Sequence, residues 1–127
     1  MNGSNNNDVV FSYTRAMAIA DGILIDATKG DLAEVSRQHF PGIHVAITDS
    51  VFLLLQRSAP AGANYQAVWH DVLWMSQHGL VKLLGNGRLF KVGIHEGTGM
   101  RWTELKILFH PGDHGEPCAT VMLPTED

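Results

Sequence analysis

The chain has 127 residues, of which 45% are hydrophobic and 17% are charged, and its formal net charge is −4 at pH 7. This length predicts one domain whose core needs no disulfide or structural metal, and the single cysteine, Cys118, excludes an internal disulfide. The net negative charge gives no general attraction to nucleic acid or anionic lipid. No apolar run is long enough to span a membrane, and the polar start lacks the pattern of a signal peptide. We therefore expect a cytoplasmic protein.

The first eight residues are rich in asparagine and predict a flexible segment, which leaves residues 9–127 as a single α+β domain. A helix is predicted over residues 15–20, because Ser12 or Thr14 can cap its first turn. The next predicted elements are a strand at residues 23–25, a helix at 32–39, a strand at 43–47 and a helix at 51–56. The last of these is so apolar that we expect protein to surround it.

The central prediction is a helix that begins near Tyr65 and carries two of the three tryptophans. On a helical wheel its core face collects Tyr65, Trp69, Val72, Leu73, Ser76, Leu80 and Leu83. This pattern favours one continuous helix to Leu84, ended by the glycines of residues 85–87. The alternative breaks the helix at Gly79 and makes residues 80–84 a strand that turns into the next one.

The opposite face of this helix carries His70, Trp74 and His78 at four-residue steps, so the three side chains form one row. An indole is usually mostly buried, and a further layer of the fold over Trp74 is the ordinary expectation. If Trp74 is exposed, the row has the composition of a protein contact surface. His70 and His78 lie about 12 Å apart along a helix, too far to share one metal ion.

Strand patterns dominate the rest of the chain. Alternating apolar residues predict strands over residues 89–95 and 103–110, joined by a hairpin loop at residues 96–100, and a third strand over residues 118–123. We therefore expect an α+β fold in which helices pack on one face of a small antiparallel β-meander.

The loop HPGDHGEP at residues 110–117 is the densest polar cluster of the chain. Zinc prefers imidazole nitrogens and carboxylate oxygens as ligands, and the loop offers such groups on His110, Asp113, His114 and Glu116. The favoured interpretation is a pair of tight turns, since Pro-Gly suits a type II turn and an aspartate can bond its own backbone. No metal ligand and no cofactor are therefore assigned, but a loop held by a rigid sheet is a reasonable recognition element.

Signals for other chemistry are weak. The glycine-rich stretches lack the spacing of nucleotide-binding loops, no serine nucleophile elbow is present, and nothing marks Cys118 as activated. The only candidates for a basic sheet face that binds nucleic acid are Arg88, Lys91, Arg101 and Lys106, and Glu104 dilutes their field. No catalytic residue is assigned, and a non-enzymatic protein is favoured.

Five motifs in one order carry a resemblance: SYTRA at residues 12–16, ADGILID at 20–26, DVLWM at 71–75, HPGDHGEP at 110–117 and TVMLP at 120–124. The chain resembles a family of small uncharacterised bacterial proteins that plasmids and phages often carry. His114 departs from this pattern, where the family has a second acidic residue. The resemblance implies no activity and no catalytic residue. It implies a context in which small proteins bind host machinery.

These observations lead to a hypothesis with two alternatives. The leading hypothesis is a non-enzymatic mobile-element protein that binds a host protein complex, as an anti-CRISPR or anti-restriction inhibitor does. Its expected contact residues are His70, Trp74, His78, Asp113, His114 and Glu116. The alternatives are a small metal-dependent hydrolase centred on His110, Asp113 and His114, and an RNA or single-stranded DNA binder on the sheet face. A homodimer is a further possibility.

Overall fold

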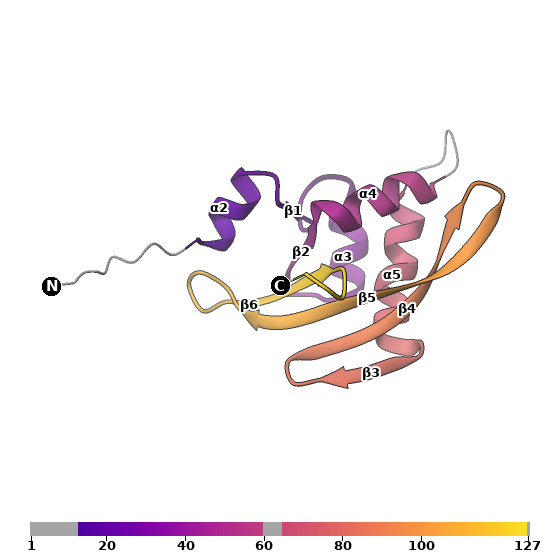
Figure 1. Cartoon of the computed structure of the whole chain (residues 1–127). Coiled ribbons are helices and arrows are strands. Elements are labelled where there is room, and N and C mark those ends of the chain that lie inside the picture. The colour runs from indigo at the N-terminus through magenta and orange to yellow at the C-terminus, as the bar shows by residue number, and fades with distance from the viewer. Residues whose placement is uncertain (1–12, 60–64, 127) are drawn as a thin grey trace, which may run out of the picture.

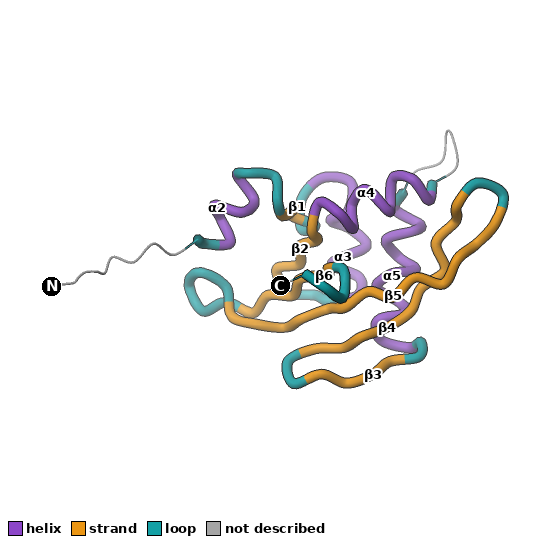
Figure 2. Tube along the Cα trace, in the orientation of Figure 1, coloured by secondary structure: helices purple, strands orange, loops and turns teal. Residues whose placement is uncertain are grey.

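The computed structural model describes residues 13–59 and 65–126. Within these residues, four helices and a six-stranded, mostly antiparallel sheet make up an α+β fold (Figures 1 and 2). The helices are α2 (Arg15–Ala20), α3 (Ala33–His39), α4 (Asp49–Ser58) and α5 (Gln66–His78), and a 3₁₀ turn at Gly30–Leu32 precedes α3. The strands are β1 (Leu24–Asp26), β2 (His44–Thr48), β3 (Val81–Leu84), β4 (Gly87–Glu96), β5 (Gly99–Pro111) and β6 (Pro117–Met122). The predicted flexible segment, residues 1–8, lies outside the described residues.

The strands follow the order β1-β2-β6-β5-β4-β3. The predicted meander is confirmed, because β4 pairs antiparallel with β5, and β5 pairs antiparallel with β6. It is extended at both ends. β3 adds an edge strand beside β4, and β2 pairs with β6 in parallel, with His44 opposite Cys118 and Ile47 opposite Val121. β6 therefore connects β1 and β2 on one side of the sheet to β5, β4 and β3 on the other.

One face of the sheet holds the main core. Phe90, Val92, Ile94, Leu105 and Ile107 point from β4 and β5 toward the helices and are almost fully buried. Each strand alternates its side chains between two faces, so the residues between these point to the opposite face. Helices α3, α4 and α5 cover the core face. The short helix α2 lies on the other face, where Arg15 reaches the side chains of His44 and Thr120.

The central helix is shorter than predicted. Gly79 ends α5 by donating its backbone N–H to the carbonyl of Met75, and residues 81–84 form β3. The continuous helix to Leu84 is wrong and the alternative with a break at Gly79 is correct. Leu80 and Leu83 are 82% and 76% exposed, so the two leucines assigned to the core face are not in the core. Pairing with β4, a tertiary interaction, decides the outcome over local helical periodicity.

The predictions for the first helices have mixed outcomes. Thr14 caps α2, accepting a hydrogen bond from the backbone N–H of Met17 at 3.1 Å, as predicted. Thr48 caps α4 in the same way. Protein does not surround α4, because its buried residues are Val51, Leu55 and Ser58, whereas Leu53 is 44% exposed. Helix α4 is an ordinary amphipathic helix on the sheet.

Candidate protein-binding surface

The outer face of α5 is open to solvent. Trp69, Val72, Leu73 and Ser76 are buried on the inner face, as predicted, whereas Trp74 is 48% exposed. The ring centroids of Trp74 and His78 lie 4.2 Å apart, and those of His70 and Trp74 lie 6.2 Å apart. The three rings of the predicted row therefore lie next to one another on the surface, tilted by 31° and 40°, and no further layer of the described chain covers Trp74.

Helix α3 extends this row with His39. Its Nε2 lies 2.9 Å from Nδ1 of His70, and its Nδ1 lies 3.0 Å from the side-chain nitrogen of Gln77. Burial lowers the pKa of His39, and the neighbouring His70 and His78 lower it further. The side-chain nitrogen of Gln77 can only donate, so Nδ1 of His39 accepts from it and Nε2 of His39 donates to His70. These hydrogen bonds anchor the row to α3.

A second exposed tryptophan lines the same hollow as Trp74. Trp102 of β5 is 60% exposed and pairs with Gly93 of β4. The hollow has a volume of about 210 Å³, and the residues that line it are Asp71, Trp74, Met75, Val92, Gly93, His95, Met100 and Trp102. Because Gly93 has no side chain, the backbone of β4 forms part of its wall.

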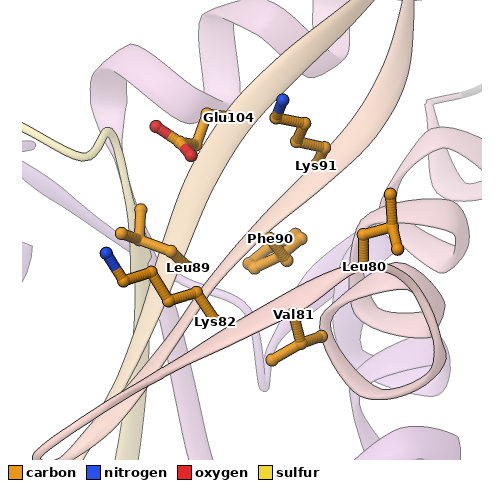
Figure 3. Close-up of a pocket in the computed structure, with 7 residues that line it drawn as sticks. All are labelled: Leu80, Val81, Lys82, Leu89, Phe90, Lys91 and Glu104. Atoms are coloured by element: carbon orange, nitrogen blue, oxygen red, sulfur yellow. The ribbon is translucent and has the colours of Figure 1, made fainter.

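Two neighbouring hollows continue this one. The first, of about 280 Å³, lies between Met75, Leu80, Lys91 and Trp102. The second, of about 250 Å³, shares Leu80 and Lys91 and reaches Lys82 and Glu104 on the open face of the sheet (Figure 3). Shared residues make the three hollows one depression along the outer side of β4. We call it the edge groove, defined by Trp74, Met75, Leu80, Lys91, Met100 and Trp102.

Of these residues, the sequence predicted Trp74 for a protein contact and Lys91 for a basic sheet face, and none of the others for a surface. Leu80 was assigned to the core, and Met100 was placed in the hairpin loop, which is shorter than predicted: it consists of residues 97–98, and Met100 belongs to β5. A signal for Trp102 was nevertheless present. It lies an odd number of residues from Leu105 and Ile107, so strand alternation puts it on the face opposite the core.

The polar loop lies elsewhere. In Figure 1 the turn between β5 and β6 lies beside α2 at one end of the sheet, whereas α5 lies toward the other end. His114 and Glu116 are exposed there, as is Asp113. The structure therefore does not bring Asp113, His114 and Glu116 together with His70, Trp74 and His78. The six predicted contact residues form two separate surfaces.

The carboxylates of this loop bind backbone amides. Asp113 accepts hydrogen bonds at 3.0 Å from the N–H groups of both Arg15 and Ala16. The hydrogen bond from Ala16 does most to lower the pKa of Asp113, the bond from Arg15 follows, and the nearby positive charges lower it further. Glu116 accepts from its own backbone and from His114, and these bonds lower its pKa as well. Asp113 thus ties α2 to the sheet, and Glu116 stabilises the turn.

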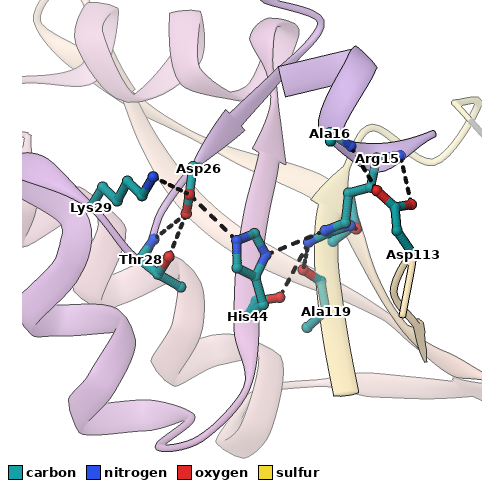
Figure 4. A network of polar contacts seen from close by, with 9 residues as sticks. Arg15, Ala16, Asp26, Thr28, Lys29, His44, Asp113 and Ala119 are labelled. Carbon is teal, nitrogen blue, oxygen red and sulfur yellow. Dashed lines mark hydrogen bonds and ion pairs between the residues drawn. The ribbon is translucent and has the colours of Figure 1, made fainter. Parts of the chain in front are cut away.

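Arg15 is the centre of a polar network under α2 (Figure 4). Its Nε donates to Nδ1 of His44 at 3.3 Å, Nη1 donates to Thr120 at 2.7 Å, and Nη2 donates to two backbone carbonyls. On its other side His44 lies 3.3 Å from Asp26. Burial alone raises the pKa of Asp26, but hydrogen bonds from Thr28 and the nearby His44 outweigh it, so the pKa is lowered.

Residues from four of the five motifs meet in this network. Arg15 belongs to SYTRA, Asp26 to ADGILID, Asp113 to HPGDHGEP and Thr120 to TVMLP. All five donor positions of the guanidinium have partners, which leaves none for a bound anion. The network therefore fastens α2 across the sheet.

The ligands of the hydrolase alternative do not converge. His110 lies 2.9 Å from Thr120, Asp113 is bonded to α2, and His114 is exposed. Over residues 13–59 and 65–126, no group of three or more histidine, cysteine, aspartate or glutamate side chains is placed to hold a metal ion. Cys118 is buried, and burial raises the pKa of its thiol, which disfavours the nucleophilic thiolate.

The predicted basic face is divided between the two sides of the sheet. Arg88 points to the helix side, where it donates to the carbonyl of Ser76, and Arg101 forms an ion pair with Glu96 at 3.3 Å. Lys91 and Lys106 occupy the opposite face, because they lie opposite Glu104 and Leu89 in the strand pairing. The expectation that all four line one face is wrong, since residues an odd number apart in a strand point to opposite faces.

Among the described helices, none combines the length and apolarity needed to cross a membrane. Comparison with known proteins gives no match to a family model, to a curated protein or to a solved structure.

Proposed function

We propose that the protein acts by binding another protein, and that its contact surface is the edge groove together with the row of His70, Trp74 and His78. One observation carries the proposal: two tryptophans, 48% and 60% exposed, line one hollow together with Met75 and Met100. Tryptophan is enriched among the residues that dominate binding energy, especially beside pockets that desolvate on association. A large exposed apolar patch on a protein of this size indicates an interaction site.

The chemistry of the surface selects the partner. Most of the groove wall is apolar, from Trp74, Met75, Leu80, Met100 and Trp102, and the polar side chains that line it are Asp71, Lys91 and His95. The partner therefore contributes apolar side chains, which fits a protein better than a charged small molecule or a nucleic acid. The resemblance described above makes a protein of the bacterial host the expected partner, and inhibition of a defence complex the expected consequence.

The other candidate functions gain less from the geometry. A hydrolase at His110, Asp113 and His114 requires side chains that converge, and these have separate partners. A nucleic-acid surface requires a continuous basic face, but Arg88 and Arg101 do not lie on the face that carries Lys91 and Lys106. Neither has an observation in its favour comparable to the paired tryptophans.

The test uses tagged protein as bait in lysate of a bacterial host, followed by reconstitution with the purified partner and calorimetry. We expect Trp102→Ala and Trp74→Ala each to weaken binding about tenfold or more, as truncation of interface tryptophans does. Leu53→Ala is the matched control, because Leu53 is comparably exposed but belongs to α4. His114→Ala reports on the separate loop surface.

Circular dichroism establishes that each variant is folded. A reconstituted partner whose affinity stays within about twofold for both tryptophan variants would show that the groove is not the contact surface. Loss of binding in His114→Ala alone would move the contact to the loop between β5 and β6.

A further inference from the structure

Strand β4 is longer than the strand that protects its outer edge. β3 pairs with β4 from Leu84 opposite Gly87 to Val81 opposite Phe90, and there the pairing ends. β4 continues to Glu96, paired on its other side with β5 along its whole length. Between Lys91 and Ile94, no other strand of the described chain lies along this edge. An open strand edge is a template for another strand.

The backbone of β4 is oriented for such pairing. His95 donates its N–H to Oγ of Ser58 at 3.0 Å, so this N–H points away from β5. Alternate residues of an antiparallel strand direct both backbone groups to the same neighbour. Gly93, two residues before His95, therefore presents its N–H and C=O at the open edge. Ser58 closes one end of this edge, and β3 closes the other.

The edge groove follows the same stretch of β4. Gly93 lines the hollow between Trp74 and Trp102, and Lys91 lines the hollow between Leu80 and Trp102. An extended segment beside Gly93 would thus place a side chain against these apolar walls. Lys82 and Lys91 lie at the β3 end of the groove with one carboxylate, that of Glu104. This local excess of positive charge favours an acidic residue at that end of the segment.

We propose that the edge groove receives an extended segment of the partner protein, which adds to the sheet as a short strand beside Gly93. The segment pairs with about four residues of β4, a length of about 13 Å at the rise of a strand. Its backbone bonds to Gly93, one apolar side chain packs between Leu80 and Trp102, and an acidic residue faces Lys82 and Lys91. This inference rests on the proposed function and specifies the form of the partner.

A second copy of the chain fits the edge less well. In a symmetric antiparallel pair centred on Gly93, Lys91 lies opposite His95 of the copy, and Phe90 lies opposite Glu96 of the copy. Val81 already occupies the place beside Phe90. The turn after β4 in the copy would therefore fall on β3. A partner segment that is free to leave the edge at this point has no such conflict.

The test is a nuclear magnetic resonance titration of ¹⁵N-labelled full-length protein. The probe is a nine-residue peptide of alternating threonine and valine, with a central leucine and glutamate at both ends, added to about millimolar concentration. The matched control is the same peptide N-methylated at the residues that face β4, which removes their hydrogen bonds and leaves their side chains. We read the Gly93 amide, the Trp74 and Trp102 indole N–H groups, and amide hydrogen exchange.

We expect fast exchange at Gly93 in the free protein and a slowing of about tenfold or more at saturation with the peptide, together with shifts of both indoles. The N-methylated peptide should abolish the effect at Gly93. Indole shifts without protection of Gly93 would overturn strand addition and leave the proposed function intact. No response at millimolar peptide would also overturn it. A protected Gly93 in free protein that sediments as a dimer would assign the edge to a second copy. Failure of the proposed function is seen separately, in unchanged partner affinity of both Trp74→Ala and Trp102→Ala.

Discussion

The buried hydrogen bond between Trp69 and Ser36 offers a direct test of how α5 is held in place. The indole Nε1 donates to Oγ of Ser36 at 2.9 Å, and both residues are at most 1% exposed. Oγ of Ser36 in turn donates to the carbonyl of Leu32. This contact fixes α5 against α3, and with it the outer face that carries Trp74.

Two substitutions remove the bond in different ways. Ser36→Ala leaves the indole N–H buried without a partner, which should lower the free energy of unfolding by about 2 kcal/mol. Trp69→Phe removes the donor and part of the ring, at about 1 kcal/mol for the hydrogen bond and a further 1–2 kcal/mol for the cavity. In the Trp69→Phe background no donor remains to be stranded, so Ser36→Ala should then cost about 0.5 kcal/mol or less.

The assay is a double-mutant cycle measured by urea unfolding, followed by far-ultraviolet circular dichroism because tryptophan fluorescence itself changes. The expected coupling energy is at least about 1 kcal/mol. Equal costs of Ser36→Ala in the two backgrounds would refute the reasoning, since the effect would then come from α3 alone.

Four further predictions concern pH dependence, strand packing and the capping of α2. Burial and the nearby His70 and His78 lower the pKa of His39 from 6.5, so the folded state holds a proton less tightly than the unfolded chain. Stability should therefore fall as the pH drops below 6.5. His39→Gln should flatten this pH dependence in urea unfolding at pH 5–7. The pKa of Asp26 is lowered from 3.8, so its carboxylate stabilises the folded state above that pH, and this stabilisation is lost as the pH falls below it. Asp26→Asn should remove this loss of stability in unfolding measured between pH 5 and 2. Gly87→Ala should lower stability by at least about 2 kcal/mol because its Cβ meets the backbone carbonyl of Ile107, whereas Gly85→Ala, with nothing within 4 Å, should be nearly neutral. Asp113→Ala should speed hydrogen exchange and proteolysis within α2 without affecting α5; unchanged protection of Arg15 and Ala16 would contradict its capping role.

Local periodicity predicted what local interactions decide. The inner face of α5, the cap of α2 and the alternation of β4 and β5 follow from residue spacing, and all are present. The end of α5 does not follow, because Leu80 and Leu83 fit both a helical face and a strand. β3 forms because its backbone pairs with β4, a contact that sequence periodicity does not encode.

The candidate surface was only half predictable for the same reason. Trp74 could be placed on the outer side of a helix, but its exposure depends on what else packs there. Trp102 comes from a distant strand, and the open edge of β4 depends on where β3 stops. Neighbours across the sheet create the groove, so no single stretch of sequence contains it.

The position of β6 has a consequence for how the chain folds during synthesis. β6 is the last strand in chain order, yet it lies between β2 and β5. β1 and β2 can form a two-stranded ribbon early, but a ribbon of this size is marginal alone. They join the rest only when residues 117–122 emerge and supply the strand between the two halves. Translation should therefore leave the β2 edge open until residues 117–122 have been made, and premature termination before β6 should leave a product that aggregates or is degraded.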